Sequence, residues 1–131
     1  RHDSRPAAEA DLAARLERGE AATLEPWVDG EALSLSLLCR GGAAPQLLSV
    51  NRQHIEVAGD GRLRDAGVSI ACIALHDARV PALAALAART VDALPGLNGY
   101  VGIDLVWHRE RGPVAIEVNP RLTCSYAGLS S

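Results

Sequence analysis

The amino-acid sequence predicts an α+β fold, an antiparallel β-sheet with flanking helices. Three observations support this class: stretches in which apolar and polar residues alternate, one long stretch with apolar residues at helical spacing, and short glycine-containing turns between the alternating stretches. The 131 residues are 48% hydrophobic and 22% charged, which is typical of a globular protein. A chain of this length buries roughly two-thirds of its unfolded surface, enough for one core.

The first predicted element is a short amphipathic helix over residues 6–18. Pro6 suits a first helical turn, Leu12 and Leu16 lie four residues apart, and Gly19 can end the helix.

Two strands are predicted next. Apolar residues alternate with serines from Leu33 to Cys39, which indicates a strand with one buried face. Leu47 to Val57 is typical of a longer strand, although residues 51–54 are polar where a plain core strand would be apolar. Asp60-Gly61 favours a hairpin turn. For Leu63–Leu75 the pattern leaves a strand and an irregular loop equally open.

The clearest helix is predicted from Asp77 to Leu94. Asp77 can cap it, Pro81 falls in its first turn, and Pro95-Gly96 ends it. Its apolar stripe consists of Leu83, Leu86, Thr90, Val91 and Leu94.

The last two strands, Tyr100 to His108 and Pro113 to Asn119, are joined by residues 109–112. With a four-residue loop, the apolar pairs on one face are Trp107 with Val114, Leu105 with Ile116, and Ile103 with Val118. The opposite face then presents Asp104 directly across from Glu117, with Asn119 two residues further along.

This polar face predicts a cation site. Two ionised carboxylates about 5 Å apart repel by roughly 3 kcal/mol at an effective dielectric near 20, so a shared proton or a cation is expected between them. Carboxylate and amide oxygens suit Mg²⁺, and Arg121 adds a planar donor for phosphate or carboxylate. The alternative is an exposed face neutralised by Arg109, Arg111 or Arg121, and the pattern alone gives it equal weight.

The segment from Glu25 to Glu31 is a second candidate site. Glu25 and Glu31 can accept hydrogen bonds from an amine or sugar hydroxyls, and Trp27 can lie against a planar ring. From these residues alone, solvated glutamates and a core tryptophan are the favoured alternative.

Composition excludes several classes of function. All 13 basic residues are Arg, which excludes lysine chemistry within this chain, and the net charge of −3 argues against a nucleic-acid partner. No apolar stretch approaches the about 20 residues that span a bilayer. Three cysteines without CxxC spacing indicate buried, reduced thiols and a cytoplasmic protein, and the histidines show no spacing for a zinc site or hydrolase triad.

Three segments together resemble the ATP-grasp superfamily of carboxylate–amine ligases. They are residues 25–31 (EPWVDGE), 99–104 (GYVGID) and 117–121 (EVNPR), and the resemblance extends from about residue 6 to the end. Residues 48–55 (LSVNRQHI) resemble a narrower group, the tyramine–glutamate ligases of methanofuran biosynthesis.

The resemblance implies ATP and Mg²⁺ as cofactors, with Mn²⁺ as an alternative ion. It implies a metal site formed by Asp104, Glu117 and Asn119, and a catalytic Arg121 that contacts the transferred phosphate or the activated carboxylate. Glu31 would hold ribose hydroxyls, and the adenine pocket would be lined by Glu25, Pro26, Trp27 and Val28. The expected reaction joins a small-molecule carboxylate to an amine through an acyl phosphate, in an enzyme that can form a homodimer.

The chain also departs from this family. The phosphate-contacting lysines and the Gly-rich loop are missing, and Gly102 stands where some members carry an Arg. We therefore expect residues 1–131 to be the C-terminal part of an ATP-grasp domain, inactive as a fragment because the N-terminal domain and phosphate-binding loop are absent. The alternative functions are a non-catalytic nucleotide- or metal-binding regulatory module and a carboxylase- or kinase-like enzyme. Arg52 is equally well explained as a phosphate contact or as an ion-pair partner.

Overall fold

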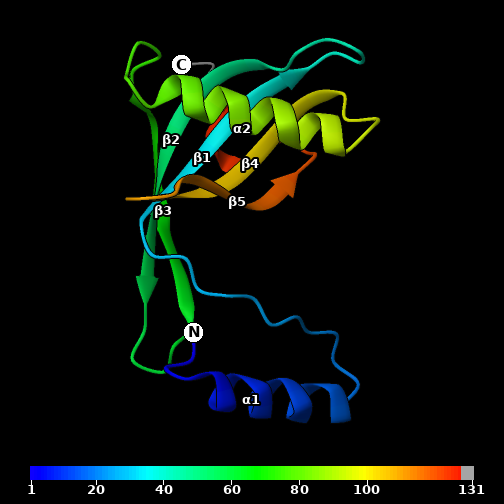
Figure 1. The fold of residues 1–131 in the computed structure, drawn as a ribbon, viewed down its shortest axis with the longest axis vertical. Helices are drawn as coiled ribbons and strands as arrows, with labels where there is room; N and C mark the ends of the chain where they lie inside the picture. Colours follow the sequence, from blue (N-terminus) through cyan, green and yellow to red (C-terminus); the bar gives the residue numbers. More distant parts are fainter. Residues whose placement is uncertain (128–131) are drawn as a thin grey trace. The chain divides into compact units, whose positions relative to one another are not determined.

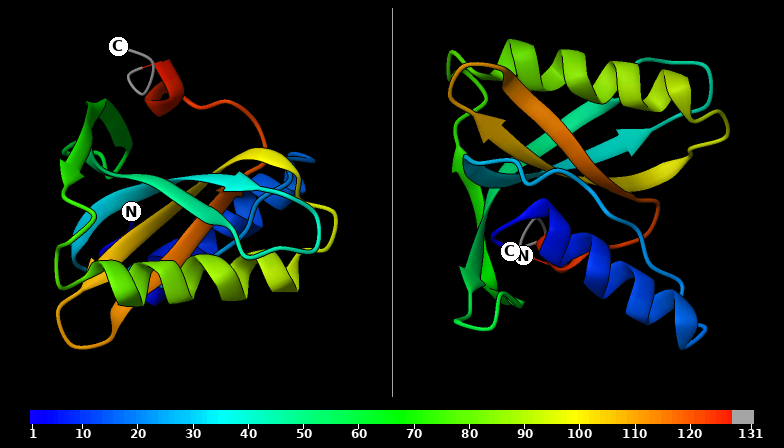
Figure 2. Two further views of the ribbon diagram at one scale, coloured as in Figure 1. Left: turned by 90° about the horizontal axis from the view of Figure 1, so that it is seen from above. Right: turned by 60° about the horizontal axis from the view of Figure 1, so that its bottom comes forward.

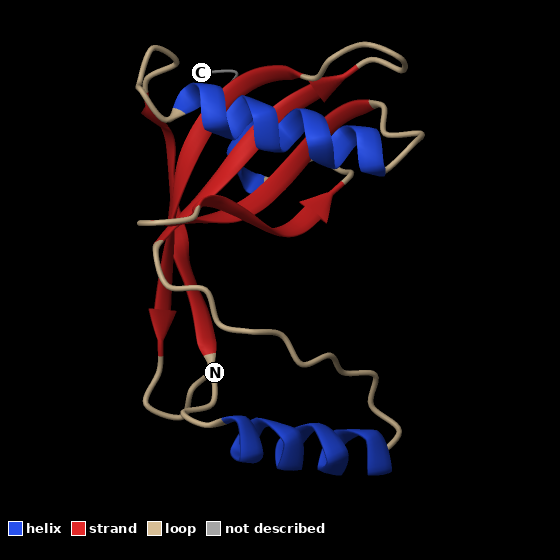
Figure 3. Ribbon diagram, in the orientation of Figure 1, coloured by secondary structure: helices blue, strands red, loops and turns tan. Residues whose placement is uncertain are grey.

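The computed structural model describes residues 1–127 and confirms the predicted α+β class (Figure 1). The described elements are α1 (Arg5–Glu17), β1 (Glu31–Cys39), β2 (Gln46–Val57), β3 (Leu63–Ile73), α2 (Val80–Ala93), β4 (Gly99–His108), β5 (Gly112–Asn119) and α3 (Cys124–Ala127). The five strands form one sheet in the order β3-β2-β1-β4-β5, and the pairs β1–β2, β1–β4 and β4–β5 are antiparallel (Figure 3).

The chain divides into two compact units. Unit 1 comprises Arg1–Trp27 and Ile55–Asp65, and unit 2 comprises Val28–His54 and Ala66–Ser131. Unit 2 contains β1, β4, β5 and α2, and therefore the predicted metal residues.

The core of unit 2 lies between α2 and one face of the sheet. Leu83, Leu86 and Ala87 of α2 pack in one cluster with leucines of β1 and apolar residues of β4. Full burial of each leucine contributes about 2 kcal/mol. The sheet residues of this cluster include Leu33, Leu35, Leu37, Val101, Ile103 and Leu105.

The serines of β1 are buried too, so the prediction of one buried face was wrong. Ser34 is 6% exposed and Ser36 is fully buried. β1 is the central strand, and α3 with the residues before it lies on the face opposite α2 (Figure 2). A strand covered on both sides has no solvated face, whatever its alternation indicates.

The helices differ from prediction mainly at their ends. α2 begins at Val80, and Asp77 does not cap it; its carboxylate instead accepts the backbone N–H of Arg79 at 2.9 Å in the preceding turn. Pro81 falls in the first turn as predicted, but Leu94 lies beyond the helix and is 43% exposed.

α1 forms as predicted, although its apolar stripe is not buried. Ser4 caps it by accepting the N–H of Ala7, and Gly19 follows its end with a left-handed backbone. Ala8 is its buried residue, whereas Leu16 is 54% exposed. No helix within residues 1–127 is long and apolar enough to cross a membrane.

The structure decides the conformation of the segment from Leu63 and the burial of the three cysteines. The segment from Leu63 is a strand, β3, as far as Ile73. All three cysteines are free, but Cys39 alone is buried, so the prediction of buried thiols was wrong for Cys72 and Cys124. Burial raises the pKa of the Cys39 thiol.

The β4–β5 register was predicted correctly at the site and wrongly near the loop. The loop is one residue shorter than predicted, so Leu105 pairs with Ala115 and Val106 with Val114. A bulge at Ile116 then inserts one residue, and Ile116 is half exposed. The bulge restores the predicted pairs from Asp104–Glu117 onward, including Ile103 with Val118.

Candidate functional site

The polar face of β4 and β5 gathers Asp104, Glu117 and Asn119 as predicted. Asp104 and Glu117 are direct partners across the two strands, and Asn119 pairs with Gly102. The side-chain amide of Asn119 donates to Asp104 Oδ2 at 3.1 Å. A second amide, that of Gln53 on β2, donates to Asp104 Oδ1 at 2.9 Å. Asp104 is therefore held on both of its oxygens.

Sequence reasoning did not select Gln53. The feature that could have indicated it is the run of polar residues at 51–54, inside a predicted strand that is otherwise mostly apolar. In the structure each of these four residues has its own hydrogen-bond partner. Asn51 donates to the buried serines of β1, and Arg52 donates to Glu31. Gln53 donates to Asp104, and His54 hydrogen-bonds Ser69.

The electrostatics of Asp104 favour a cation. Burial raises the pKa of its carboxyl, and the negative charge of Glu117 raises it further. The hydrogen bonds from Gln53 and Asn119 and the charge of Arg121 act in the opposite direction, to a smaller extent. A bound positive ion would offset the effect of Glu117 on Asp104 and favour the ionised Asp104 carboxylate.

The donor set fits a hard divalent ion. It offers two carboxylates and one amide oxygen, and Mg²⁺ commonly takes one or two carboxylates while keeping water or phosphate oxygens as its other ligands. Within residues 1–127, no three His, Cys, Asp or Glu side chains cluster as a metal site would require. An ion here would therefore depend on the Asn119 amide oxygen beside the two carboxylates and on water or phosphate oxygens.

Gly102 allows the C-terminal segment to lie against this face. A Cβ atom at this position would come within 2.9 Å of the Thr123 side chain and 3.7 Å of the Asn119 Cβ. An alanine here would force the Thr123 side chain to shift, whereas its distance to the Asn119 Cβ would be an ordinary van der Waals contact. The close packing of Thr123 against β4 therefore depends on the absence of a side chain at residue 102.

A cluster of hydroxyls anchors the residues that follow Arg121. The Tyr100 hydroxyl lies 2.9 Å from both Ser36 Oγ and Thr123 Oγ1 and 3.2 Å from Ser125 Oγ. Its ring also packs edge-on against Tyr126, with centroids 5.3 Å apart. These contacts hold the segment after Arg121 on the sheet, whereas the Arg121 side chain is exposed.

Glu31, the predicted ribose ligand, is engaged by two arginines. Its Oε1 accepts from Arg52 at 2.7 Å and its Oε2 from Arg79 at 2.9 Å. The Arg79 guanidinium also bonds Asp77 and lies 5.9 Å from the centroid of the Trp107 ring. Of the two roles left open for Arg52, the structure shows the ion pair.

The other residues of the predicted adenine segment belong mostly to unit 1. Glu25, Pro26 and Trp27 line a cavity of about 560 Å³ together with residues at the start of the chain. Trp27 is 44% exposed and the Arg1 guanidinium lies 5.1 Å from its ring centroid, so it is not a core residue. Val28 begins unit 2 and is half-buried. Their role in adenine binding stays a prediction.

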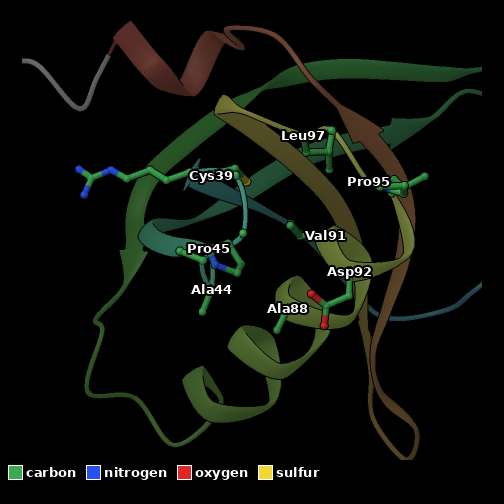
Figure 4. A pocket seen from close by; sticks show the side chains of 14 residues that line it. Cys39, Ala44, Pro45, Ala88, Val91, Asp92, Pro95 and Leu97 are labelled. Atoms are coloured by element: carbon green, nitrogen blue, oxygen red, sulfur yellow. The ribbon is translucent and has the colours of Figure 1, made fainter.

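A further cavity lies between the β1–β2 turn and the end of α2, with a volume of about 420 Å³ (Figure 4). Asp92 and Ala88 of α2 line it opposite Ala44 and Pro45 of the turn. No motif in the sequence indicates this cavity, and none of the predicted site residues lines it.

Comparison with known proteins places these features in a family. The model of the ATP-grasp domain matches residues 7–125. Tyramine–L-glutamate ligases of Methanocaldococcus jannaschii and Methanocaldococcus fervens are each 32% identical over 116 residues, which is 82% of this chain. The chain spans about a third of the length of these relatives, 32% and 33%.

A solved structure supports the same assignment. The crystal structure of a protein from Archaeoglobus fulgidus, described as ATP-grasp superfamily, superposes with a TM-score of 0.60 at 36% identity. The match covers 74% of this chain and 29% of the other. With a family match over most of its residues and this shared fold, the chain belongs to the ATP-grasp family.

Proposed function

We propose that this chain contributes the metal-binding part of an ATP-dependent carboxylate–amine ligase. The observation that carries the proposal is the Asp104, Glu117 and Asn119 cluster on one face of β4 and β5, in a chain of the ATP-grasp family. The ligase activity of the relatives supports the reaction class.

Charge neutralisation is the main contribution of these residues. Asp104, Glu117 and the Asn119 amide oxygen hold one or two Mg²⁺ ions, or Mn²⁺, which supply positive charge to the phosphates of ATP. Arg121, exposed just beyond β5, contacts the transferred phosphate or the activated carboxylate. Positioning and charge stabilisation of this kind supply most of the catalysis in phosphoryl transfer.

The reaction proceeds in two steps. A substrate carboxylate oxygen attacks the γ-phosphorus of ATP, and the bond to the β-phosphate oxygen breaks to release ADP. An amine then attacks the carbonyl carbon of the acyl phosphate, and phosphate leaves as the amide forms and the nitrogen loses a proton.

Nucleotide recognition is assigned to the segment from Glu25 to Glu31. Glu25, Pro26, Trp27 and Val28 line the adenine pocket, and Glu31 holds the ribose hydroxyls. Glu31 Oε1 lies 2.7 Å from Nε and 2.6 Å from Nη2 of Arg52, whereas Oε2 accepts one hydrogen bond, from Arg79, and keeps a second lone pair for a hydroxyl.

The names of the relatives define the first substrates to test. Tyramine and L-glutamate are the amine and acid of those ligases, and a role in methanofuran-type cofactor biosynthesis is the narrower form of this proposal. Since ATP is the phosphoryl donor, the proposed reaction takes place in the cytoplasm, with small molecules rather than nucleic acids as partners.

The test uses the full-length protein with Mg·ATP, L-glutamate, and tyramine or a panel of other amines. We expect amine-dependent ADP release and a product with the mass of the amide. Glu117→Ala should lower turnover roughly 100-fold or more, because a metal ligand is lost. Glu110→Ala, in the exposed β4–β5 loop, is the matched control and should retain activity. Full turnover in Glu117→Ala would refute the proposal, and ATP binding without any turnover would indicate a non-catalytic module.

A further inference from the structure

We propose that Gln53 is a positioning residue that fixes the Asp104 carboxylate for metal binding. The inference rests on the proposed function, since it concerns the same cation site. It assigns a role to a residue on β2, two strands away from Asp104 on β4.

The sheet provides a path for this contact. β1 lies between β2 and β4, and on the face shared with Asp104 it carries Ala32 and Ser34. These are small side chains, and the long Gln53 side chain reaches past them to donate to Asp104 Oδ1 at 2.9 Å. A leucine in either place would block the approach, because the neighbouring strands are only about 4.8 Å apart.

Two amide donors then define the orientation of the carboxylate. Gln53 donates to Oδ1 and Asn119 to Oδ2, so the carboxylate plane is held from two directions. Each oxygen uses one lone pair for an amide and keeps another for a cation. A ligand held in this way loses little rotational freedom when the ion binds, which is the general effect of hydrogen bonds to metal-binding carboxylates.

The two donors are not equivalent. Asn119 is itself in the proposed metal shell, and its amide oxygen is expected to contact the ion. Gln53 is attached to a different strand and acts through Asp104. Removing Gln53 should therefore weaken metal binding without removing a ligand, which separates positioning from direct coordination.

The experiment measures Mn²⁺ binding to the full-length protein by the loss of the free-ion electron paramagnetic resonance signal, with Mg²⁺ as competitor. Gln53→Met keeps the length of the side chain and removes the amide group that donates to Asp104. We expect roughly ten- to hundredfold weaker Mn²⁺ binding. Gln46→Met, at an exposed position on the same strand, is the matched control and should bind as the unsubstituted protein does. Thermal unfolding without metal shows whether each variant is folded.

A second variant keeps the proposal testable if Gln53→Met does not fold. Gln53→Asn retains the amide but is one methylene too short to span β1, so its Mn²⁺ affinity should fall as well. Folded variants that bind Mn²⁺ as tightly as the unsubstituted protein would overturn the role of Gln53 alone. Failure of the unsubstituted protein to bind Mn²⁺, with or without ATP, would instead overturn the metal site on which the inference rests.

Discussion

Replacing Glu117 by Gln is expected to stabilise the metal-free protein and to remove its stabilisation by Mg²⁺. Glu117 stands directly across from Asp104, and its charge is one of the causes that raise the pKa of Asp104. Glutamine keeps the shape of the side chain and removes that charge, while the amide donors of Gln53 and Asn119 stay in place.

The size of the effect follows from the pairing. Directly opposed residues on antiparallel strands have Cβ atoms about 5 Å apart, which gives roughly 3 kcal/mol of repulsion at an effective dielectric of 20. Glu117 is exposed, so solvent screening reduces this to about 1 kcal/mol. For a protein of this length, that corresponds to a rise in Tm of about 4 °C.

The pH dependence has a defined sign. The pKa of Asp104 is raised in the folded state, first by burial and then by Glu117. The folded protein therefore holds this proton more tightly than the unfolded chain does. Protonation of Asp104 therefore stabilises the folded state. This stabilisation is complete below the pKa of about 3.9 in the unfolded chain and is lost as the pH rises through the pKa of Asp104 in the folded state. Glu117→Gln should lose less stability than the unsubstituted protein over that rise.

The assay is thermal unfolding in a chelator and in millimolar Mg²⁺, at pH 4 and pH 7. Glu110→Gln, which removes a carboxylate from an exposed loop, controls for the change in net charge. A Glu117→Gln protein that is no more stable than this control, without metal at pH 7, would refute the repulsion between Asp104 and Glu117. An equal rise in Tm with Mg²⁺ in Glu117→Gln and the unsubstituted protein would refute the role of Glu117 as a metal ligand.

Two further substitutions test the packing that supports the site. Gly30→Ala should cost about 3 kcal/mol in urea unfolding, because its φ is +152° and the new Cβ would collide with the Trp107 carbonyl; Gly41→Ala, which meets open space, should stay within about 0.5 kcal/mol. Tyr100→Phe should cost about 1–2 kcal/mol by the same measurement, because it removes a partner from the buried Ser36 hydroxyl. Unchanged unfolding midpoints in Gly30→Ala or Tyr100→Phe would contradict these accounts.

The accuracy of the sequence predictions depended on how local each feature was. The element types and the Asp104–Glu117 pairing follow from alternation along single strands, and the structure has both. The Asp104–Glu117 pair was predicted correctly although the turn is one residue shorter than predicted, because the extra residue at Ile116 compensates for the shorter turn. A bulge leaves no distinct mark in an apolar strand, so the register at Leu105 could not be predicted correctly.

The burial of the serine face of β1 likewise could not be predicted from the alternation of leucine and serine. Ser34 and Ser36 alternate with leucines as solvated residues do, yet both are buried. They are satisfied by hydrogen bonds from Asn51 and, at Ser36, from Tyr100, which come from other strands. Alternation reports polarity, and only the arrangement of neighbouring elements decides whether a polar residue meets water or a partner.

The sequence by itself determined the α+β class, the resemblance to ATP-grasp enzymes and the three oxygen-bearing residues of the candidate site, because periodicity and short motifs are local properties. The tertiary structure alone decided which groups hold those residues in place. Gln53 reaches Asp104 across a whole strand, and Glu31 lies between two arginines 21 and 48 positions away. Contacts over such separations depend on strand order and on the size of the residues between, and neither is encoded in the spacing of the residues that meet.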